Sequence, residues 1–328
     1  MGVMLTLVLP CHNEAEAILE TARQLLALLG EQEQSRRCHA DSLILFIDDG
    51  STDRTWALIE QLAAAHPGRC AGLRLARNVG HQHALLAGLL QAPGEVLISI
   101  DADLQDDIAV VPKMLDLYAQ GHDIVYGVRS QRGCDTVFKR MTAVGFYRLM
   151  RRLDVDVIYN HADYRLMSRR AIEILRQYGE VNLFLRGIVR LIGLPSARVY
   201  YERQERIAGR TKYSVLKMCA LALEGITSFS VAPLRVISLL GLVTSVFALL
   251  VSIWVLVVAL TNSAAVPGWA STVIPVTLLG GVQIFSIGVL GEYVGKAYLE
   301  TKRRPRFIVE KSVGVRVAAT ADDGVKRP

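Results

Sequence analysis

The strongest constraint on the fold is a regular alternation, over residues 1–130, between short apolar runs and longer segments with helical periodicity. The apolar runs are Leu5–Leu9, Leu43–Ile47, Gly72–Leu75, Val96–Ile100 and Ile124–Tyr126. The helical patterns between them cover Ile18–Leu29, Thr55–Ala65, His83–Leu90 and Val110–Ala119. Strands alternating with helices predict an α/β fold with a parallel sheet of the nucleotide-binding type. Ligands of such sheets bind beyond the carboxyl ends of the strands, so the polar residues after each run are the first candidates for a site.

Two later stretches are long, apolar and uncharged. Val236–Leu260 carries no charged residue, and neither does Ala270–Gly291. Each exceeds the roughly 18–20 residues that cross about 30 Å of hydrocarbon. The 52% hydrophobic residues and the mean hydropathy of +0.31 fit either a richer core or a membrane segment, so the distribution of these residues decides. Their concentration in two long uncharged stretches favours the membrane, with buried core helices as the alternative. We therefore predict transmembrane helices over residues 234–261 and 270–294.

Basic residues flank these two stretches, in a chain of net charge +6. The short connection Thr261–Trp269 carries no Lys or Arg, so the positive-inside rule places both long flanks in the cytoplasm. We expect an inner-membrane, multi-pass protein with amphipathic interface helices over residues 213–232 and a basic cytoplasmic tail over residues 295–328, disordered at its end. The flanking cations are Arg203, Arg206, Arg210, Lys212 and Lys217 before the stretches, and Lys296, Lys302, Arg303, Arg304 and Arg306 after them.

Composition narrows the function further. The five cysteines are scattered and form no CxxC pair, which argues against a disulfide framework or a zinc site. No GxGxxG follows the first strand, which excludes a dinucleotide oxidoreductase. Only the pI of about 9.1 favours nucleic-acid binding, so we expect no nucleic-acid partner.

The segment Asp101-Ala102-Asp103-Leu104-Gln105 directly follows the apolar run VLISI. Two carboxylates one residue apart at a strand end can bind one hard cation. Mg²⁺ and Mn²⁺ prefer oxygen ligands, usually take one or two of them from the protein, and fill their remaining coordination positions with phosphate oxygens and water. Such a metal would neutralise the charge of a leaving nucleotide. A solvated turn is the alternative for an isolated Asp-x-Asp, and the following Asp106 and Asp107 also fit a helix N-terminus.

Two further polar segments follow strands. Asp48-Asp49-Gly50-Ser51-Thr52-Asp53 contains a tight turn and helix-capping residues, but two carboxylates at the strand end go beyond capping and suit a base N–H and a ribose hydroxyl. Pro10-Cys11-His12-Asn13-Glu14 ends the first strand and predicts the other side of a nucleotide site, with a plain turn as the alternative.

These three segments, in this order, resemble the family 2 glycosyltransferases. Ala76–Gln82 is similar to that family's RNxGHQ element, and DADLQD resembles the branch of dolichol-phosphate mannose synthase and the bactoprenol glucosyltransferases. Ala162–Met167 and Arg206–Tyr213 are similar to two further elements of this branch, and Gly291–Gly295 to a third. The resemblance extends from residue 4 to about residue 310.

The resemblance implies a GT-A catalytic domain over residues 1–212 and assigns roles by position. It implies an inverting transfer whose catalytic residues are Asp101, Asp103 and Asp163, with Asp163 orienting the acceptor or a sugar hydroxyl. His12 stands where many relatives carry Tyr, which puts a stacking role in doubt. The implied nucleotide-binding residues are Pro10, His12, Glu14, Asp48, Asp49 and Arg77. The implied metal ligands are Asp101, Asp103 and Gln105, and the residues expected on the acceptor or diphosphate are Arg129, Arg206, Arg210 and Lys212, with surface charge as the alternative for Arg129.

The predicted function is transfer of a hexose, with glucose from UDP-glucose as first choice, to undecaprenyl or another polyprenyl phosphate. A phosphate monoester has a second pKa near 6, so it is largely ionised at neutral pH and needs no strong protein base. Galactose, an N-acetylhexosamine, an aminoarabinose derivative and GDP-mannose remain open as donors, and so do the cell-envelope polysaccharide served and homo-oligomerisation. Alternatives are a processive polysaccharide synthase, which would carry QxxRW and more spans, and a non-catalytic membrane adaptor, which would not need these motifs together.

Overall fold

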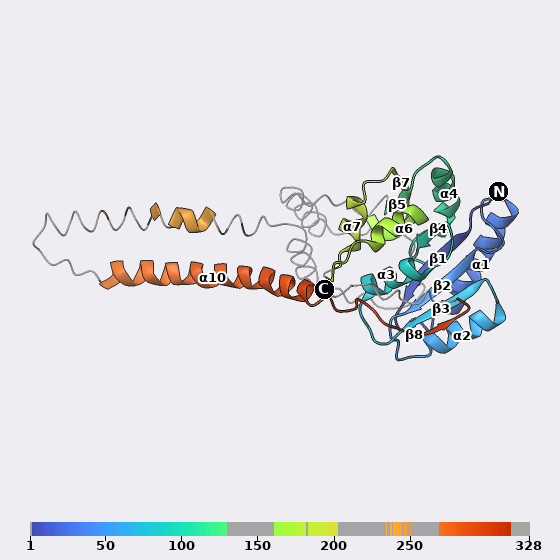
Figure 1. Cartoon of the computed structure of the whole chain (residues 1–328), viewed down its shortest axis with the longest axis horizontal. Coiled ribbons are helices and arrows are strands. Elements are labelled where there is room, and N and C mark those ends of the chain that lie inside the picture. Colours follow the sequence, from blue (N-terminus) through green and yellow to red (C-terminus); the bar gives the residue numbers. More distant parts are fainter. Residues whose placement is uncertain are drawn as a thin grey trace, which may run out of the picture. The chain divides into compact units, whose positions relative to one another are not determined.

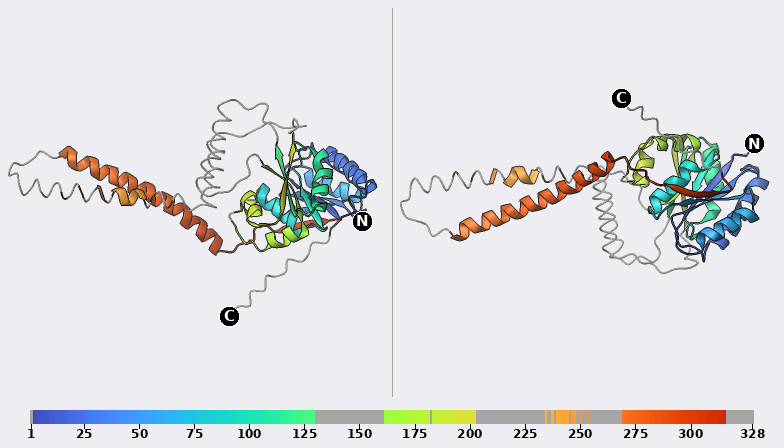
Figure 2. Two further views of the ribbon diagram at one scale, coloured as in Figure 1. Left: turned by 90° about the horizontal axis from the view of Figure 1, so that it is seen from above. Right: turned by 60° about the horizontal axis from the view of Figure 1, so that its bottom comes forward.

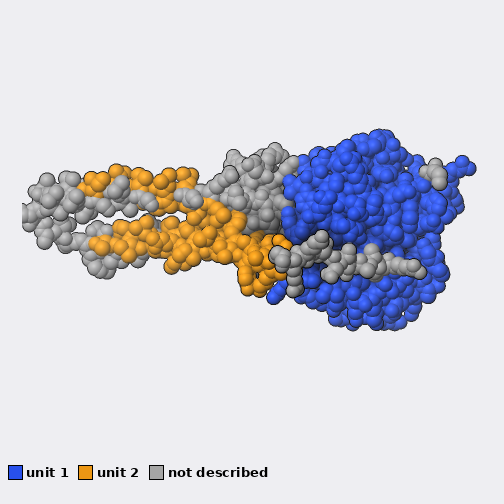
Figure 3. All heavy atoms as spheres, in the orientation of Figure 1, with its two compact units in different colours: residues 1–148, 156–213, 304–328 blue, residues 149–155, 214–303 orange. Residues whose placement is uncertain are grey.

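A computed structural model describes residues 2–129, 161–181, 183–202 and 269–315, with scattered positions between 234 and 253 (Figure 1). The chain divides into two compact units, coloured separately in Figure 3. Unit 1 comprises residues 1–148, 156–213 and 304–328, and unit 2 comprises residues 149–155 and 214–303. Unit 2 is therefore an insertion in the sequence of unit 1.

Unit 1 is built on an eight-stranded sheet in the order β7-β5-β6-β4-β1-β2-β3-β8. The four central strands β4, β1, β2 and β3 are parallel to one another, β6 runs antiparallel between β4 and β5, and β8 pairs antiparallel with β3. The predicted α/β fold with a mostly parallel sheet is thereby confirmed. The strands are β1 (Leu5–Cys11), β2 (Leu43–Asp48), β3 (Cys70–Leu75), β4 (Val96–Ser99), β5 (Ile124–Arg129), β6 (His161–Ser168), β7 (Ser196–Tyr201) and β8 (Val309–Val313).

Helices cover both faces of this sheet (Figure 2). On one face, apolar side chains of α1, α2 and α4 form a single buried cluster with Leu5, Leu7 and Leu9, which alternate along β1. The helices of unit 1 are α1 (Ile18–Gln34), α2 (Thr55–Ala65), α3 (His81–Gln91), the short 3₁₀ helix η1 (Ile108–Val110), α4 (Val111–Ala119), α6 (Arg169–Arg176) and α7 (Leu185–Leu191).

The opposite face of the sheet carries α3, which contacts β1, β2 and β4 and packs beside α6. The close approach of α3 depends on Gly88. A Cβ added to Gly88 would lie 2.5 Å from Cγ1 of Val8 and 2.7 Å from Cγ1 of Ile47. This packing brings the body of α3 directly against β1 and β2.

The predicted elements of residues 1–130 are all present, with ends that shift by a few residues. The predicted helix Ile18–Leu29 continues to Gln34, and the predicted strand Gly72–Leu75 begins at Cys70. After residue 160 the sequence indicated no regular elements for β6, α6, α7 and β7. The strand β8 lies within the segment that we had interpreted as a basic tail.

Unit 2 contains α10 (Trp269–Thr301), which includes the uncharged stretch 270–291 and has Pro275 in its interior. Several of its apolar side chains are exposed: Val276, Ile284, Phe285, Ile287, Leu290 and Val294. Within the described part of the chain, no helix has the combined length and apolarity of a membrane span, so the two predicted transmembrane helices are not confirmed. Residues 213–232 and most of 234–261 lie outside the described residues.

Candidate active site

The strands β4, β1 and β2 are parallel, so their carboxyl ends lie at one edge of the sheet. Cys11 at the end of β1 is in register with Asp48 at the end of β2, and the Ile100 amide donates to the Val8 carbonyl at 3.0 Å. The segments that follow these strands therefore leave the sheet side by side. This is the edge at which the sequence predicted a ligand site.

The loop after β1 is tied to the loop after β2 by hydrogen bonds. The Asn13 amide donates to Oγ of Ser51 at 2.9 Å, and the Thr52 amide donates to Oδ1 of Asn13 at 2.9 Å. Nδ1 of His12 lies 3.0 Å from the carbonyl oxygen of Asp49. Asn13 adopts φ +55°, a left-handed conformation that Asn tolerates better than most residues. The segments 10–14 and 48–53, which the sequence predicts to bind a nucleotide, are thus joined into one surface, here called the ledge.

Asp49 joins this ledge to the loop between β3 and α3. Its Oδ1 accepts from the Val79 amide at 2.8 Å and its Oδ2 from the Gly80 amide at 3.0 Å. Next to it, Gly50 has φ +63°, and a Cβ there would lie 2.6 Å from the Asn78 nitrogen. Both carboxylate oxygens of Asp49 are therefore engaged in holding the RNxGHQ loop.

Asp48, the last residue of β2, is the first residue of the β2 side of this ledge, and its side chain is fully buried. Its Oδ1 accepts from the Ser51 amide at 3.1 Å, and its Oδ2 lies 3.5 Å from Nε of Arg74 on β3. Burial raises the pKa of Asp48, while the hydrogen bonds from Ser51 and the charge of Arg74 oppose that shift.

The segment after β4 brings carboxylates together at the same edge. The pKa of Asp101 is raised to about 6, chiefly by burial and in addition by the charges of Asp106, Asp163 and Asp103, while the charge of His81 opposes the shift. The backbone turns back at Leu104, which has φ +48°, and the Gln105 amide donates to Oδ1 of Asp103 at 3.3 Å. A group of acids that disfavour one another's ionisation is an environment that a cation would relieve.

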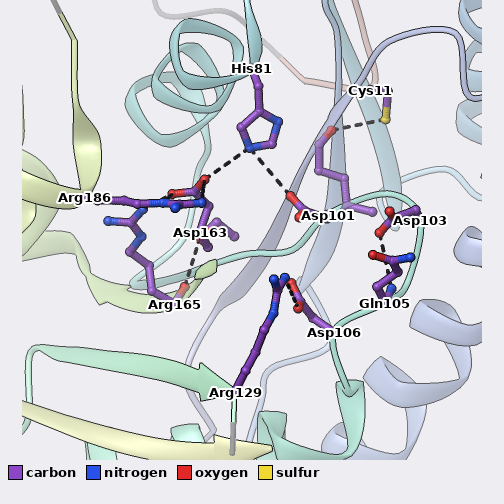
Figure 4. A network of polar contacts seen from close by, with 12 residues as sticks. Cys11, His81, Asp101, Asp103, Gln105, Asp106, Arg129, Asp163, Arg165 and Arg186 are labelled. Atoms are coloured by element: carbon purple, nitrogen blue, oxygen red, sulfur yellow. Dashed lines mark hydrogen bonds and ion pairs between the residues drawn. The ribbon is translucent and has the colours of Figure 1, made fainter. Parts of the chain in front are cut away.

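His81 at the start of α3 links Asp101 to Asp163 of β6 (Figure 4). Its Nε2 lies 3.6 Å from Oδ1 of Asp101 and 3.6 Å from Oδ2 of Asp163. Burial lowers the pKa of His81, but the neighbouring carboxylates of Asp163 and Asp101 outweigh burial and raise the pKa above its usual value.

Asp163 is held by two arginines in addition to His81. Nη2 of Arg165 lies 2.6 Å from Oδ1 of Asp163, while Nε and Nη2 of Arg186 lie 3.1 and 3.0 Å from Oδ1 and Oδ2. Burial favours the neutral acid, but Arg186, His81 and Arg165 outweigh burial and hold the pKa of Asp163 well below its usual range. Asp163 therefore stays ionised and is a weak proton acceptor.

A second buried carboxylate, Asp106, fixes Arg129 at the end of β5. Nη2 of Arg129 lies 3.0 Å from Oδ1 of Asp106, and the Tyr201 hydroxyl donates to the same oxygen at 2.5 Å. Oδ2 of Asp106 is buried and has no hydrogen-bond partner within the described residues. Arg129 is thus held in place by β7 and by the loop after β4.

Comparison with known proteins assigns this arrangement to a family. Residues 6–175 match the family model described as glycosyl transferase family 2. The chain belongs to glycosyl transferase family 2. It is a glycosyltransferase, and its sheet is the GT-A-like α/β arrangement expected for this family.

The similarity to individual glycosyltransferases extends over nearly the whole chain. The uncharacterized glycosyltransferase YkoT of Bacillus subtilis (strain 168) is 50% identical over 94% of this chain and 91% of its own length. The prophage bactoprenol glucosyl transferase homolog of Escherichia coli (strain K12) is 40% identical over 94% of this chain and 98% of its own length. A solved structure of mannosyltransferase PcManGT from Pyrobaculum calidifontis, in complex with GDP-Man and Mn²⁺, matches with a TM-score of 0.47 and 17% identity, covering 91% of this chain and 85% of that chain.

The structure of this family 2 glycosyltransferase brings several of the predicted site residues to one edge, namely His12, Asp48, Asp49, Asp101, Asp103, Gln105 and Asp163. Asp101 and Asp163 meet through His81, and His12, Asp48 and Asp49 share the ledge. The remaining predicted residues are placed less directly. Pro10 is buried within β1, Glu14 donates its amide to Thr55, Arg77 is exposed beside the ledge, Arg129 pairs with Asp106, and Arg206, Arg210 and Lys212 lie outside the described residues.

Sequence reasoning missed several members of this glycosyltransferase site. His81, within the RNxGHQ element, was expected to be a structural or hydrogen-bonding residue rather than a metal ligand, but its position between Asp101 and Asp163 was not predicted. Arg165 lies two residues after Asp163 in a quoted motif and was not singled out. No sequence pattern indicated a role for Arg186 on α7, because its partner Asp163 lies on β6, a different element.

The acidic residues fit a divalent cation only with help from a ligand. Among the described residues, no group of three His, Cys, Asp or Glu side chains is arranged to hold a metal ion. Mg²⁺ and Mn²⁺ in nucleotide enzymes commonly use one or two carboxylates and complete their shell with phosphate oxygens and water. Asp101 and Asp103, with the raised pKa of Asp101, suit that kind of shared site.

Proposed function

We propose that this glycosyltransferase moves a hexose from a nucleoside diphosphate sugar to the phosphate of a polyprenyl lipid such as undecaprenyl phosphate. The observation that carries the proposal is the state of Asp163. A carboxylate held ionised by two arginines is a poor general base, so the site suits an acceptor that is already ionised. The name of the E. coli relative, bactoprenol glucosyl transferase homolog, supports the same acceptor class and glucose as the first sugar to test.

The donor would lie across the carboxyl ends of β1, β2 and β4. Pro10, His12, Glu14, Asp48, Asp49 and Arg77 are proposed for the nucleotide side, where Asp48 and Asp49 shape the ledge. Asp101 and Asp103, together with Gln105, would hold a Mg²⁺ or Mn²⁺ ion, which when bound neutralises charge on the diphosphate. UDP is the proposed nucleotide.

The chemistry proposed is a single displacement with inversion. A phosphate oxygen of the lipid attacks the anomeric carbon, the bond from that carbon to the diphosphate breaks, and a nucleoside diphosphate leaves. The chain's own contribution is to orient both substrates and to stabilise negative charge. His81 supplies positive charge beside Asp101, and Arg186 supplies it beside Asp163. Arg129, Arg206, Arg210 and Lys212 are proposed for the acceptor phosphate or the diphosphate.

We propose in addition that the enzyme works at the cytoplasmic face of the inner membrane. Support comes from the uncharged stretches 236–260 and 270–291, from their basic flanks, and from the apolar side chains exposed on α10, of which Ile284 is 75% exposed. A polyprenyl phosphate presents its phosphate at the interface, so a membrane-bound enzyme would meet it there. Flotation of the full chain with liposomes tests this part: a chain that stays at the bottom of the gradient would contradict it.

The central experiment measures transfer of radiolabelled sugar from UDP-glucose, UDP-galactose, UDP-N-acetylglucosamine, UDP-aminoarabinose and GDP-mannose to undecaprenyl phosphate in detergent. It includes Mg²⁺ or Mn²⁺, a chelated sample, Asp103→Ala, and Asp41→Ala as a matched control on an exposed residue. We expect label in the lipid phase from UDP-glucose, lost on chelation and in Asp103→Ala but kept in Asp41→Ala. Absence of lipid product from every donor, with folded protein, would overturn the acceptor assignment.

A further inference from the structure

Arg74 stands between two carboxylates that come from different strands. Its Nε lies 3.5 Å from Oδ2 of Asp48 on β2 and 3.6 Å from Oε2 of Glu310 on β8. The first partner belongs to the ledge proposed for the nucleotide. The second comes from the strand that follows α10 in the sequence.

The pairing of β8 with β3 explains why Glu310 reaches Arg74. Arg74 pairs with Lys311, whereas Leu75 pairs with Val309, so the register shifts and Glu310 is the extra residue of a bulge. The Ala76 amide also donates to the Ile308 carbonyl at 2.9 Å, which holds β8 against the end of β3. A bulge re-aims a side chain, and here it directs a carboxylate towards the arginine beside the site.

The contact between Arg74 and Asp48 leaves polar atoms unsatisfied. Oδ2 of Asp48 and Nε of Arg74 are buried and make no hydrogen bond to any other described residue. Buried polar groups without partners are costly and uncommon, and a ligand is one of the things that satisfies them. The side chain of Arg74 is 29% exposed, whereas that of Asp48 is fully buried. Arg74 can therefore meet a ligand through its exposed atoms while its buried Nε faces Asp48.

We propose that Arg74 is a positioning residue for the donor nucleotide, which holds the Asp48 carboxylate in place and is itself anchored by Glu310 of β8. The inference rests on the proposed function, because that function places the nucleotide beside Asp48. It adds that the strand after α10 completes the nucleotide end of the site. Arg74 acts on donor binding, and the displacement at the anomeric carbon does not involve it.

The test measures the Kd for UDP of the full chain in detergent, together with KM for the nucleotide sugar, KM for the lipid, and kcat. The variants are Arg74→Ala, Arg74→Lys and Glu310→Gln. The matched control is Arg69→Ala, which removes an arginine paired with Glu33 just before β3, at the opposite end of the strand. Because Glu310 is 46% exposed, its substitution leaves the fold intact even where Arg74→Ala does not.

We expect Arg74→Ala to weaken UDP binding and raise the donor KM about tenfold, the order of effect that follows loss of one charged partner. The KM for the lipid and kcat stay near wild type, Arg74→Lys recovers part of the affinity, and Glu310→Gln weakens UDP binding about two- to threefold. The proposal is overturned if Arg74→Ala and Arg69→Ala bind UDP equally well. It is also overturned if Arg74→Lys and Glu310→Gln match the wild type. A wild-type chain that binds neither UDP nor GDP would overturn it together with the proposed function, so the two failures are distinguishable.

Discussion

Replacing Gly50 by alanine tests the close backbone packing between the loops after β2 and β3. Gly50 adopts φ +63°, and a Cβ there would lie 2.6 Å from the Asn78 nitrogen and 2.7 Å from the Arg77 carbonyl carbon. These are backbone atoms, so no side chain can rotate away. The neighbouring Asp49 binds the Val79 and Gly80 amides, and a shift of the loop would lengthen both hydrogen bonds.

The magnitude has two parts. A left-handed conformation costs a residue with a Cβ about 1–2 kcal/mol. Forcing extra volume into a packed position costs about 1–3 kcal/mol more. Gly68 provides the matched control, because it has φ +74° and nothing within 4 Å of an added Cβ. We therefore expect Gly68→Ala to lose about 1–2 kcal/mol and Gly50→Ala about 2–5 kcal/mol.

The assay heats the detergent-solubilised full chain with a thiol-reactive dye. Cys11, Cys38 and Cys70 are free and buried, so they react when unit 1 unfolds. At roughly 2–4 °C per kcal/mol, Gly50→Ala should melt about 2–12 °C below Gly68→Ala. It should also bind UDP more weakly, whereas Gly68→Ala should bind it like the wild type. Equal melting temperatures for the two variants would refute the steric reasoning.

Three further predictions concern the charged network. Asp163→Asn removes the negative charge that pairs with Arg165 and Arg186, and breaking such a buried pair should lower the free energy of unfolding by about 3–5 kcal/mol. Asp41→Asn is the control, and a loss in Asp163→Asn no larger than in Asp41→Asn would contradict the prediction. Because the pKa of Asp101 is raised to about 6, this group stabilises the fold below its unfolded pKa near 3.9, and that stability is lost as the pH rises through about 6. A bound cation reverses this effect, so the rise in Tm caused by Mn²⁺ should shrink below pH ~6 and vanish in Asp101→Asn; an equal rise at pH ~5 and ~7.5 would count against a shared metal site. Tyr201→Phe deletes the hydroxyl that donates to buried Asp106 and should lower stability by about 1–3 kcal/mol in thermal melts, and an unchanged Tm would show that Arg129 alone satisfies this carboxylate.

The first half of the fold was predictable because its signals are local. The apolar runs of β1, β2 and β4 are buried on both faces of the sheet, so they stand out from the helices around them. Their polar successors, including Asp48 and Asp101, could be placed at one edge by the geometry of parallel strands alone.

The later strands carry weaker signals. β8 reads VEKSV, with its three central residues exposed, and nothing in that pattern separates an edge strand from a polar tail. β6 inserts antiparallel between β4 and β5, a pairing between residues far apart in the chain that local periodicity cannot reveal.

The site was predicted in part for the same reason. Asp101 and Asp163 were found because they stand in motifs, but the cations that control them come from other elements. Arg186 lies on α7 and His81 on α3, and only the folded sheet brings both to Asp163. The prediction that Asp163 would orient an acceptor stays a prediction.

The pairing of β3 with β8 sets an order of events during synthesis. The whole of the α10 segment lies between these two partners in the sequence, so it leaves the ribosome before the edge of β3 is covered. An open strand edge offers unpaired amides and carbonyls to other chains, and nascent chains fold in the order in which they are made. A polypeptide that stalls before Val309 would therefore leave β3 as an open edge of its sheet, and would be prone to pair with other nascent chains on the same messenger RNA.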